Sequence, residues 1–164
     1  MVCEQDVILA VDQQRNSTGK VRQVVLHRWD TGDGFADSPV TLTQDGVAIG
    51  VDGTWDDGSR MPTAYWWIAG ALLWLTTSGE VWKTDVDSGA SERAFSVEAA
   101  DPAIPQNCTA QPDSVVCAQR FQDRIEINSY RLPDGATEAP VVVKEVPGTP
   151  DLTVMDIAMV DLHG

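Results

Sequence analysis

Basic side chains are scarce in this sequence, which has 11 Lys and Arg against 25 Asp and Glu and a formal net charge of −14. Nucleic-acid-binding proteins neutralise phosphates with clustered Lys and Arg, and anionic membrane surfaces attract the same residues. The composition therefore excludes a nucleic-acid partner and disfavours attachment to an anionic membrane. We interpret the acidity as a contribution to solubility, with a cation-binding role as the alternative.

Long apolar runs and targeting segments are missing as well. The most apolar window, residues 65–75, is far shorter than the roughly 20 residues that a membrane-spanning helix needs. The first residues lack the basic region and the cleavage site of a signal peptide. We therefore expect a buried segment at 65–75 and no membrane insertion by this chain.

Groups for nucleophilic catalysis are few. The sequence has 2 histidines, of which His163 is near the end of the chain and His27 lies on an alternating strand where a structural role is favoured. No nucleophile elbow, phosphate loop or dinucleotide fingerprint is present. We predict no catalytic residue, with a pair of carboxylates far apart in the sequence, as glycoside hydrolysis needs, as the open alternative.

The sequence has 3 cysteines, and two of them are suitably spaced for a disulfide. Cys108 and Cys117 flank TAQPDSVV, and a hairpin turn over residues 111–114 would place them opposite each other on antiparallel strands. The alternatives are buried free thiols or half of a metal site, although no CxxC motif or nearby His supports zinc. A disulfide implies an oxidising compartment, hence an extracellular or periplasmic location. Cys3 starts a strand whose hairpin partner would precede residue 1, as in a piece of a longer exported protein, with a lone thiol as the alternative.

Short apolar runs between turn signals predict an all-β chain, and no window has a helical period. The runs fall into groups at residues 1–43, 47–97 and 103–145, and 151–164 resembles the start of a further group. We expect a polar loop at 12–20 and a strand starting near residue 105. The other expected strands are 6–11, 21–29, 38–43, 47–51, 64–69, 72–76, 80–85, 92–97, 115–121, 124–130 and 139–145.

One phrase recurs in each group: a strand, then an acidic turn that contains glycine. It reads WDTGDG up to Gly34, DVDSGA at 85–90 and LPDGA at 132–136. We interpret each copy as the hairpin between the third and fourth strands of a sheet, where Gly32, Gly89 and Gly135 supply a positive φ and Asp or Ser bonds back to the backbone. Repeats of about 40 to 50 residues in an all-β chain favour propeller blades.

The segment ALLWLTTSGEVWKTDVDSGASERAF, residues 71–95, resembles a blade of the PQQ-like (quinoprotein-type) β-propeller repeats. Residues 85–89 match the D-x-x-T/S-G signature of that family, 29–32 match it less closely, and 131–135 match it loosely. The resemblance implies a partial β-propeller of about three four-stranded antiparallel blades, and exported propellers of this type often carry a hairpin disulfide.

Propellers close with about four to eight blades, so three blades leave a ring open. We expect this chain to be a segment of a longer propeller or to form a homodimer that completes a ring, and a β-sandwich is the alternative fold.

Aromatic and acidic residues supply the candidate ligand site. Trp66 and Trp67 are neighbours in a predicted strand, so one points into the core and the other either packs between blades, which is favoured, or stacks on a sugar ring or planar cofactor. Trp55 is the better ligand candidate because it lies in the Gly- and Asp-rich loop VDGTWDDGSR, together with Asp56 and Asp57.

Asp85 and Asp87 are weak candidates for a calcium site. Calcium needs about six to eight oxygen ligands, and this turn supplies two carboxylates without the closing Glu of an EF-hand loop. Turn chemistry explains both residues. We therefore expect no metal and no cofactor, with calcium as the alternative.

These observations lead to two hypotheses. The first is a non-enzymatic, exported or cell-envelope propeller segment that binds a protein or carbohydrate partner through its loops. The second is a piece of a propeller enzyme, a glycan-active hydrolase or quinone-dependent dehydrogenase, whose other blades lie outside this chain.

Overall fold

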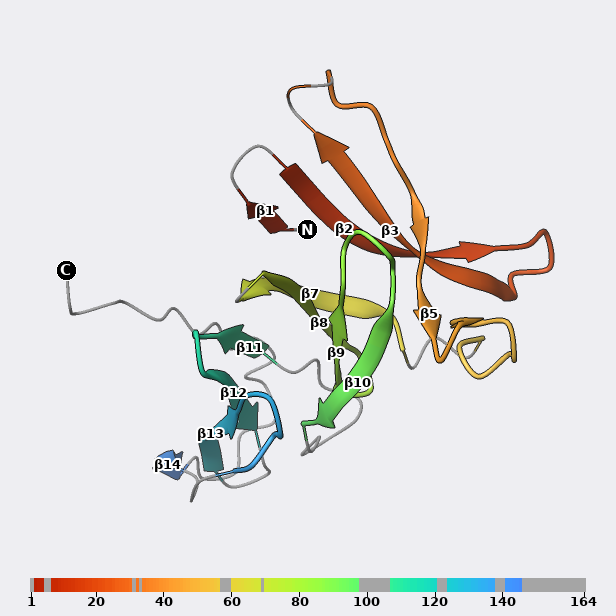
Figure 1. The fold of residues 1–164 in the computed structure, drawn as a ribbon. Helices are drawn as coiled ribbons and strands as arrows, with labels where there is room; N and C mark the ends of the chain where they lie inside the picture. The colour runs from red at the N-terminus through yellow and green to blue at the C-terminus, as the bar shows by residue number, and fades with distance from the viewer. Residues whose placement is uncertain are drawn as a thin grey trace. The chain divides into compact units, whose positions relative to one another are not determined.

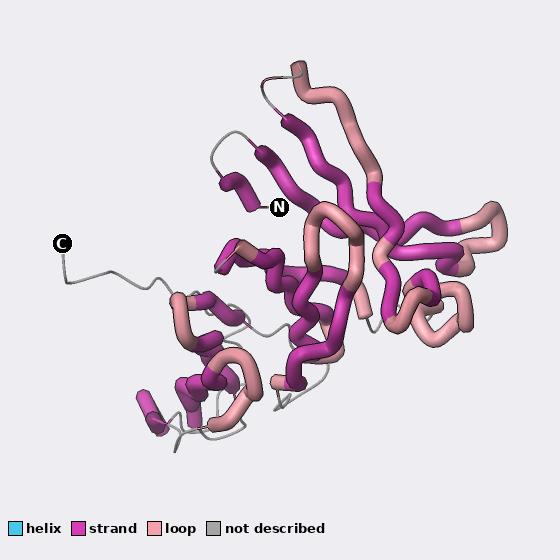
Figure 2. Tube along the Cα trace, in the orientation of Figure 1, coloured by secondary structure: helices cyan, strands magenta, loops and turns pink. Residues whose placement is uncertain are grey.

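The structure is a computed structural model of the chain and describes residues 2–4, 7–30, 32, 34–56, 60–68, 70–97, 107–120, 124–137 and 141–145. Over these residues the chain forms strands and loops without a helix (Figure 2). In this described part, no segment is a helix with the length and apolarity to cross a membrane. The same residues contain three four-stranded sheets and one two-stranded sheet (Figure 1). The predicted all-β, antiparallel fold class is thereby confirmed.

The chain divides into two compact units, Met1–Ala94 and Phe95–Gly164. The first sheet belongs to the first unit and follows the order of the chain, with β1 (Val2–Glu4), β2 (Val7–Arg15), β3 (Val21–Asp30) and β4 (Val40–Thr41). In β1 the backbone of Cys3 pairs with Ile8 of β2. Cys3 thus has a cross-strand partner in the segment that follows it, whereas β1 is the edge strand of this sheet, and a further partner before residue 1 stays a prediction.

β2 and β3 form a longer ribbon than the sequence predicts (Figure 1). Residues 12–15, expected in a loop, continue the ladder as far as the pair between Arg15 and Val21. The turn after them is closed by Asn16, whose Oδ1 accepts hydrogen bonds from the backbone of Thr18 and Lys20 at 2.9 and 3.0 Å. Polar side chains favoured a loop, but a solvent-exposed ribbon tolerates them while its backbone groups stay paired.

A two-stranded sheet of β5 (Thr43–Gln44) and β6 (Val47–Ala48) follows β4. Its turn is Asp45-Gly46, with φ of 51° and 77°, which are the positive angles that an Asp-Gly hairpin turn requires. The strands expected at 38–43 and 47–51 are wrong in extent, because this tight turn divides the segment into pieces of two residues. The turn also places the side chains of Gln44 and Asp45 at the edge of the pocket described below.

The second four-stranded sheet has β7 (Pro62–Ile68), β8 (Ala71–Thr76), β9 (Glu80–Thr84) and β10 (Ser91–Ser96) in sequential order. β8 is buried on both faces, as its continuous apolar run predicts. Its alternate residues Leu72 and Trp74 join a core that also takes residues from the first sheet, from Trp82 of β9 and from the loop before β7. The members of that core are Leu9, Val11, Val21, Val24, Leu26, Leu42, Ile49, Trp55, Leu72, Trp74 and Trp82.

The third four-stranded sheet lies in the second unit and contains β11 (Asn107–Ala110), β12 (Ser114–Arg120), β13 (Arg124–Arg131) and β14 (Val141–Glu145). β11 and β12 pair in the predicted register, with Cys108 opposite Cys117, and a disulfide joins these two residues. The predicted disulfide is confirmed. It indicates an oxidising, extracellular-type environment.

The repeated acidic turns connect the third and fourth strands of the three four-stranded sheets, as predicted. In two copies the glycine has a positive φ, 72° at Gly89 and 68° at Gly135. The prediction for Gly32 is wrong, since Gly34 and Phe35 take the positive φ values there, 69° and 63°. Sequential four-stranded sheets occur in propeller blades, and antiparallel sheets also build sandwiches, so the choice between these folds stays a prediction. Residues 151–164 lie outside the described part.

Candidate functional site

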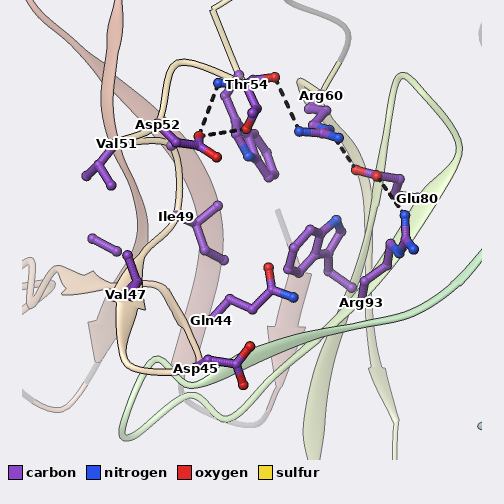
Figure 3. Close-up of a pocket in the computed structure, with 14 residues that line it drawn as sticks. Gln44, Asp45, Val47, Ile49, Val51, Asp52, Thr54, Arg60, Glu80 and Arg93 are labelled. Atoms are coloured by element: carbon purple, nitrogen blue, oxygen red, sulfur yellow. Dashed lines mark hydrogen bonds and ion pairs between the residues drawn. The ribbon is translucent and has the colours of Figure 1, made fainter.

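A pocket of about 530 Å³ lies in the first unit, between the loop that follows β5 and strands β9 and β10 (Figure 3). We call it the Glu80 pocket. Its walls are formed by residues of the 44–55 stretch and by Arg60, Glu80, Trp82 and Arg93. Its volume falls within the range of about 300 to 1,000 Å³ that small-ligand sites occupy.

Glu80 is a buried carboxylate in this pocket, 7% exposed. It begins β9, and because side chains alternate along a strand it shares a face with Trp82, two residues later. Its Oε1 lies 3.3 Å from Nη1 of Arg93, and its Oε2 lies 3.0 Å from Nε of Arg60. The Arg60 contact is an ion pair without a well-aligned hydrogen bond. Two arginines thus hold one buried charge, which would be costly without a partner.

Arg60 is fixed from several sides. Its guanidinium lies 5.6 Å from the ring centroid of Trp55, a cation–π distance, and its Nη1 donates to the carbonyl oxygen of Thr54 at 3.3 Å. Its own carbonyl accepts a hydrogen bond from Nε2 of Gln13 at 3.2 Å. These contacts hold the guanidinium toward Glu80 (Figure 3).

The loop wall of the pocket is stiffened by carboxylates that bond to backbone groups. Oδ1 of Asp52 accepts hydrogen bonds from the hydroxyl and backbone N–H of Thr54 at 2.7 and 3.1 Å, and these bonds lower the pKa of Asp52. Oδ1 of Asp56 accepts from the backbone N–H of Val21 at 2.7 Å and ties the loop to β3. Asp56, predicted as a ligand residue, therefore has a structural contact, and Asp57 lies outside the described residues.

Trp55 borders the pocket but is 3% exposed. Its ring packs against those of Trp74 and Trp82, with centroids 6.0 and 5.8 Å away. A loop position suggested an accessible stacking surface, whereas the structure turns the indole into the core. Its contribution to the site is therefore the support that it gives to Arg60 and Trp82.

The buried indoles of Trp74 and Trp82 differ in their hydrogen bonds. They stack at a centroid distance of 5.6 Å, and Nε1 of Trp74 donates to Oγ1 of Thr84 at 3.0 Å. Nε1 of Trp82 is buried and has no hydrogen-bond partner within the described residues, although Trp82 lines the pocket. A residue that lines the pocket therefore carries a buried donor without a partner among the described residues.

The other predicted aromatic residues lie away from this pocket. Trp67 packs against the core cluster, as predicted for one member of the pair, and Trp66 is half-buried opposite Leu73. Neither lines the Glu80 pocket. His27 also lies elsewhere: its Nδ1 is 2.9 Å from the carboxylate of Asp37, and its ring stacks on another indole.

Asp85 and Asp87 are engaged in turn and surface contacts. Oδ1 of Asp85 accepts from the backbone N–H of Asp87 at 3.1 Å and from the N–H and hydroxyl of Ser88 at 2.9 and 2.8 Å. Asp87 forms an ion pair of 2.9 Å with Arg28. The predicted turn chemistry of Asp85 is confirmed, and over the described residues no group of three or more His, Cys, Asp or Glu is placed to hold a metal ion.

The turn of Asp85 predicts a specific loss of stability in acid. The backbone N–H and then the hydroxyl of Ser88 lower the pKa of Asp85 below its ordinary value of 3.8. Because the folded carboxylate binds a proton less readily than the unfolded one, its contribution is complete above pH 3.8 and is lost as the pH falls through the lower, folded value. We expect Asp85→Asn to flatten the fall in unfolding free energy below pH 4, measured by urea titration at several pH values. Equal pH slopes for the two proteins would contradict this.

Four residues of the candidate site were not predicted from the sequence: Glu80, Trp82, Arg60 and Arg93. The available signal was the spacing of Glu80 and Trp82, two residues apart in a strand in which every residue except Lys83 is buried. Nothing in the sequence pairs Arg60 and Arg93 with that carboxylate. No protein-family model, curated protein or solved structure matches the chain, so its functional interpretation rests on this geometry.

Proposed function

We propose that the chain is a non-enzymatic binding segment of an exported or cell-envelope β-propeller and that the Glu80 pocket holds its protein or carbohydrate ligand. The observation that carries this proposal is a buried carboxylate fixed by two arginines at the wall of a hollow. Ligand sites commonly combine such a preformed concavity with a few fixed polar groups.

Two further observations support the propeller and its setting. Each of the three four-stranded sheets runs in sequential strand order, which is the strand order of a blade, and each reaches its fourth strand through an acidic turn. The disulfide of Cys108 and Cys117 supports a location outside reducing compartments.

Binding through the pocket is tested with Glu80→Gln, which keeps the shape of the side chain and removes its charge. We expect wild-type protein to give a signal on a glycan or peptide array, and Glu80→Gln to weaken it at least about tenfold because the carboxylate and both arginines lose their arrangement. Glu92→Gln is the matched control, since Glu92 is 72% exposed, lies 3.8 Å from Lys83 and does not line the pocket. Equal signals from all three proteins would overturn the proposal.

A further inference from the structure

The unused N–H of Trp82 is informative because the rest of the indole is so well packed. Trp82 is 5% exposed, and buried indole N–H groups usually find a partner. The neighbouring Trp74 has one in Thr84. A buried donor left unpaired costs free energy in the unliganded protein, and this cost is recovered when a ligand supplies an acceptor. The pocket therefore favours a ligand that places an oxygen atom at Nε1 of Trp82.

Acceptor groups line the same pocket as Trp82. Glu80 lies on the same face of β9 as Trp82, and the amide of Gln44, the last residue of β5, points into the pocket (Figure 3). A ligand that satisfies both kinds of group must carry donors and acceptors on neighbouring atoms. Hydroxyl groups do this, because each one donates a proton and accepts through its lone pairs.

The charges around the pocket favour a neutral ligand. Three carboxylates, those of Asp45, Asp52 and Glu80, line the pocket together with two arginines, and both arginines are paired with Glu80. Among the described residues that line the pocket, no positive charge is left over for an anion, and the chain as a whole carries a formal net charge of −14. The apolar side chain of Ile49 points into the pocket (Figure 3), which gives the C–H surface of a ligand a place to pack.

We propose that the Glu80 pocket binds a neutral saccharide, one of whose hydroxyl oxygens accepts a hydrogen bond from Nε1 of Trp82 while a neighbouring hydroxyl donates to Glu80 or Gln44. This inference rests on the proposed function and specifies its ligand. A pocket of about 530 Å³ suits one or two sugar rings better than a protein surface, since protein partners typically bury about 800 Å² each on a flat interface.

The test follows the indole N–H resonance of Trp82 by NMR in the ¹⁵N-labelled chain. The probes are neutral disaccharides with gluco, galacto, manno and N-acetyl groups, and blocked extended tripeptides serve as the alternative ligand. We expect at least one disaccharide to shift the Trp82 resonance saturably and to move the Trp74 resonance less. Trp82→Phe is expected to weaken the affinity for that saccharide at least about tenfold, which corresponds to the loss of one good hydrogen bond.

Trp74→Phe is the matched variant, because it makes the same ring change at a stacked neighbour that does not line the pocket. If Trp82→Phe fails to fold, Gln44→Ala tests the second contact, that of the neighbouring hydroxyl, at an exposed residue, and we expect it to weaken saccharide binding as well. The saccharide inference is overturned if no disaccharide shifts the Trp82 resonance. It is also overturned if the only partner found for the Trp82 N–H is a bound water molecule. If the peptides shift the Trp82 resonance instead, the proposal of a binding pocket is supported and the saccharide inference is wrong. If no probe shifts the Trp82 resonance and Glu80→Gln leaves the array signal unchanged, both the binding function of the pocket and the saccharide inference are wrong.

Discussion

Replacing Gly89 by alanine is expected to lower the free energy of unfolding by about 2 to 4 kcal/mol. Gly89 has a φ of 72°, where an alanine is strained. An added Cβ would lie 2.5 Å from the carbonyl oxygen of Thr41 and 2.8 Å from Cγ1 of Val40. The backbone of Thr41 cannot move aside as a flexible side chain can. The β9–β10 turn would therefore be pushed away from β4 of the first sheet. The hydrogen bond from Thr43 N to the Gly89 carbonyl, 2.9 Å long, would be strained as well.

Urea unfolding followed by tryptophan fluorescence measures this loss, because the indoles of Trp55, Trp74 and Trp82 lie in the core that both sheets share. Gly70→Ala is the matched control: its φ is 78°, but an added Cβ meets no atom within 4 Å. We expect the free energy of unfolding of that variant to fall by about 1 kcal/mol, which is the cost of placing an alanine at a positive φ without a steric clash. Similar losses at both positions would show that the close approach of Gly89 to the first sheet is not tight in solution.

The turns were predictable from the sequence because their causes are local. Asp85 accepts its hydrogen bonds from residues two and three positions later, and Gly89 follows at a fixed offset. The same locality explains why the register of Cys108 and Cys117 was correct, since one hairpin turn fixes it. The first copy of the turn shows the limit: its extra residues move the positive φ from Gly32 to Gly34 and Phe35.

The pocket was not predictable in the same way, because it depends on contacts between distant segments. Periodicity identifies Trp82 as inward-facing but does not say that the loop residue Trp55 will pack beside it. The loop composition suggested an exposed aromatic residue, and tertiary packing overrode that suggestion. Glu80 meets Arg60 and Arg93 only after β9, β10 and the loop before β7 are assembled. Only a tertiary arrangement could single out these two arginines among the 11 basic residues.

The disulfide gives the second large expected effect: its reduction should lower the stability of the second unit by about 2.5 kcal/mol. Cys108 and Cys117 are 9 residues apart, and a crosslink that closes a loop of this length removes about that much conformational freedom from the unfolded chain. Cys117 is fully buried, so the bond is also part of a packed sheet. Comparing oxidised with reduced wild-type protein leaves the sequence unchanged and creates no cavity from a substitution.

We expect a strong reductant to shift the urea unfolding midpoint of the wild type downward and to raise hydrogen exchange at the paired β11 and β12 amides. A variant with Cys108→Ala and Cys117→Ala should unfold at a low midpoint that no longer responds to the reductant. Cys3→Ala is the control, and it should keep the full response, because Cys3 lies in β1 of the first unit. A wild-type midpoint that ignores the reductant would mean either that the thiols are free in solution or that the hairpin is held by its neighbours alone. The mass difference of two hydrogen atoms between the oxidised and reduced chains separates those outcomes. The second would place the stability of this sheet in the ladder between β12 and β13.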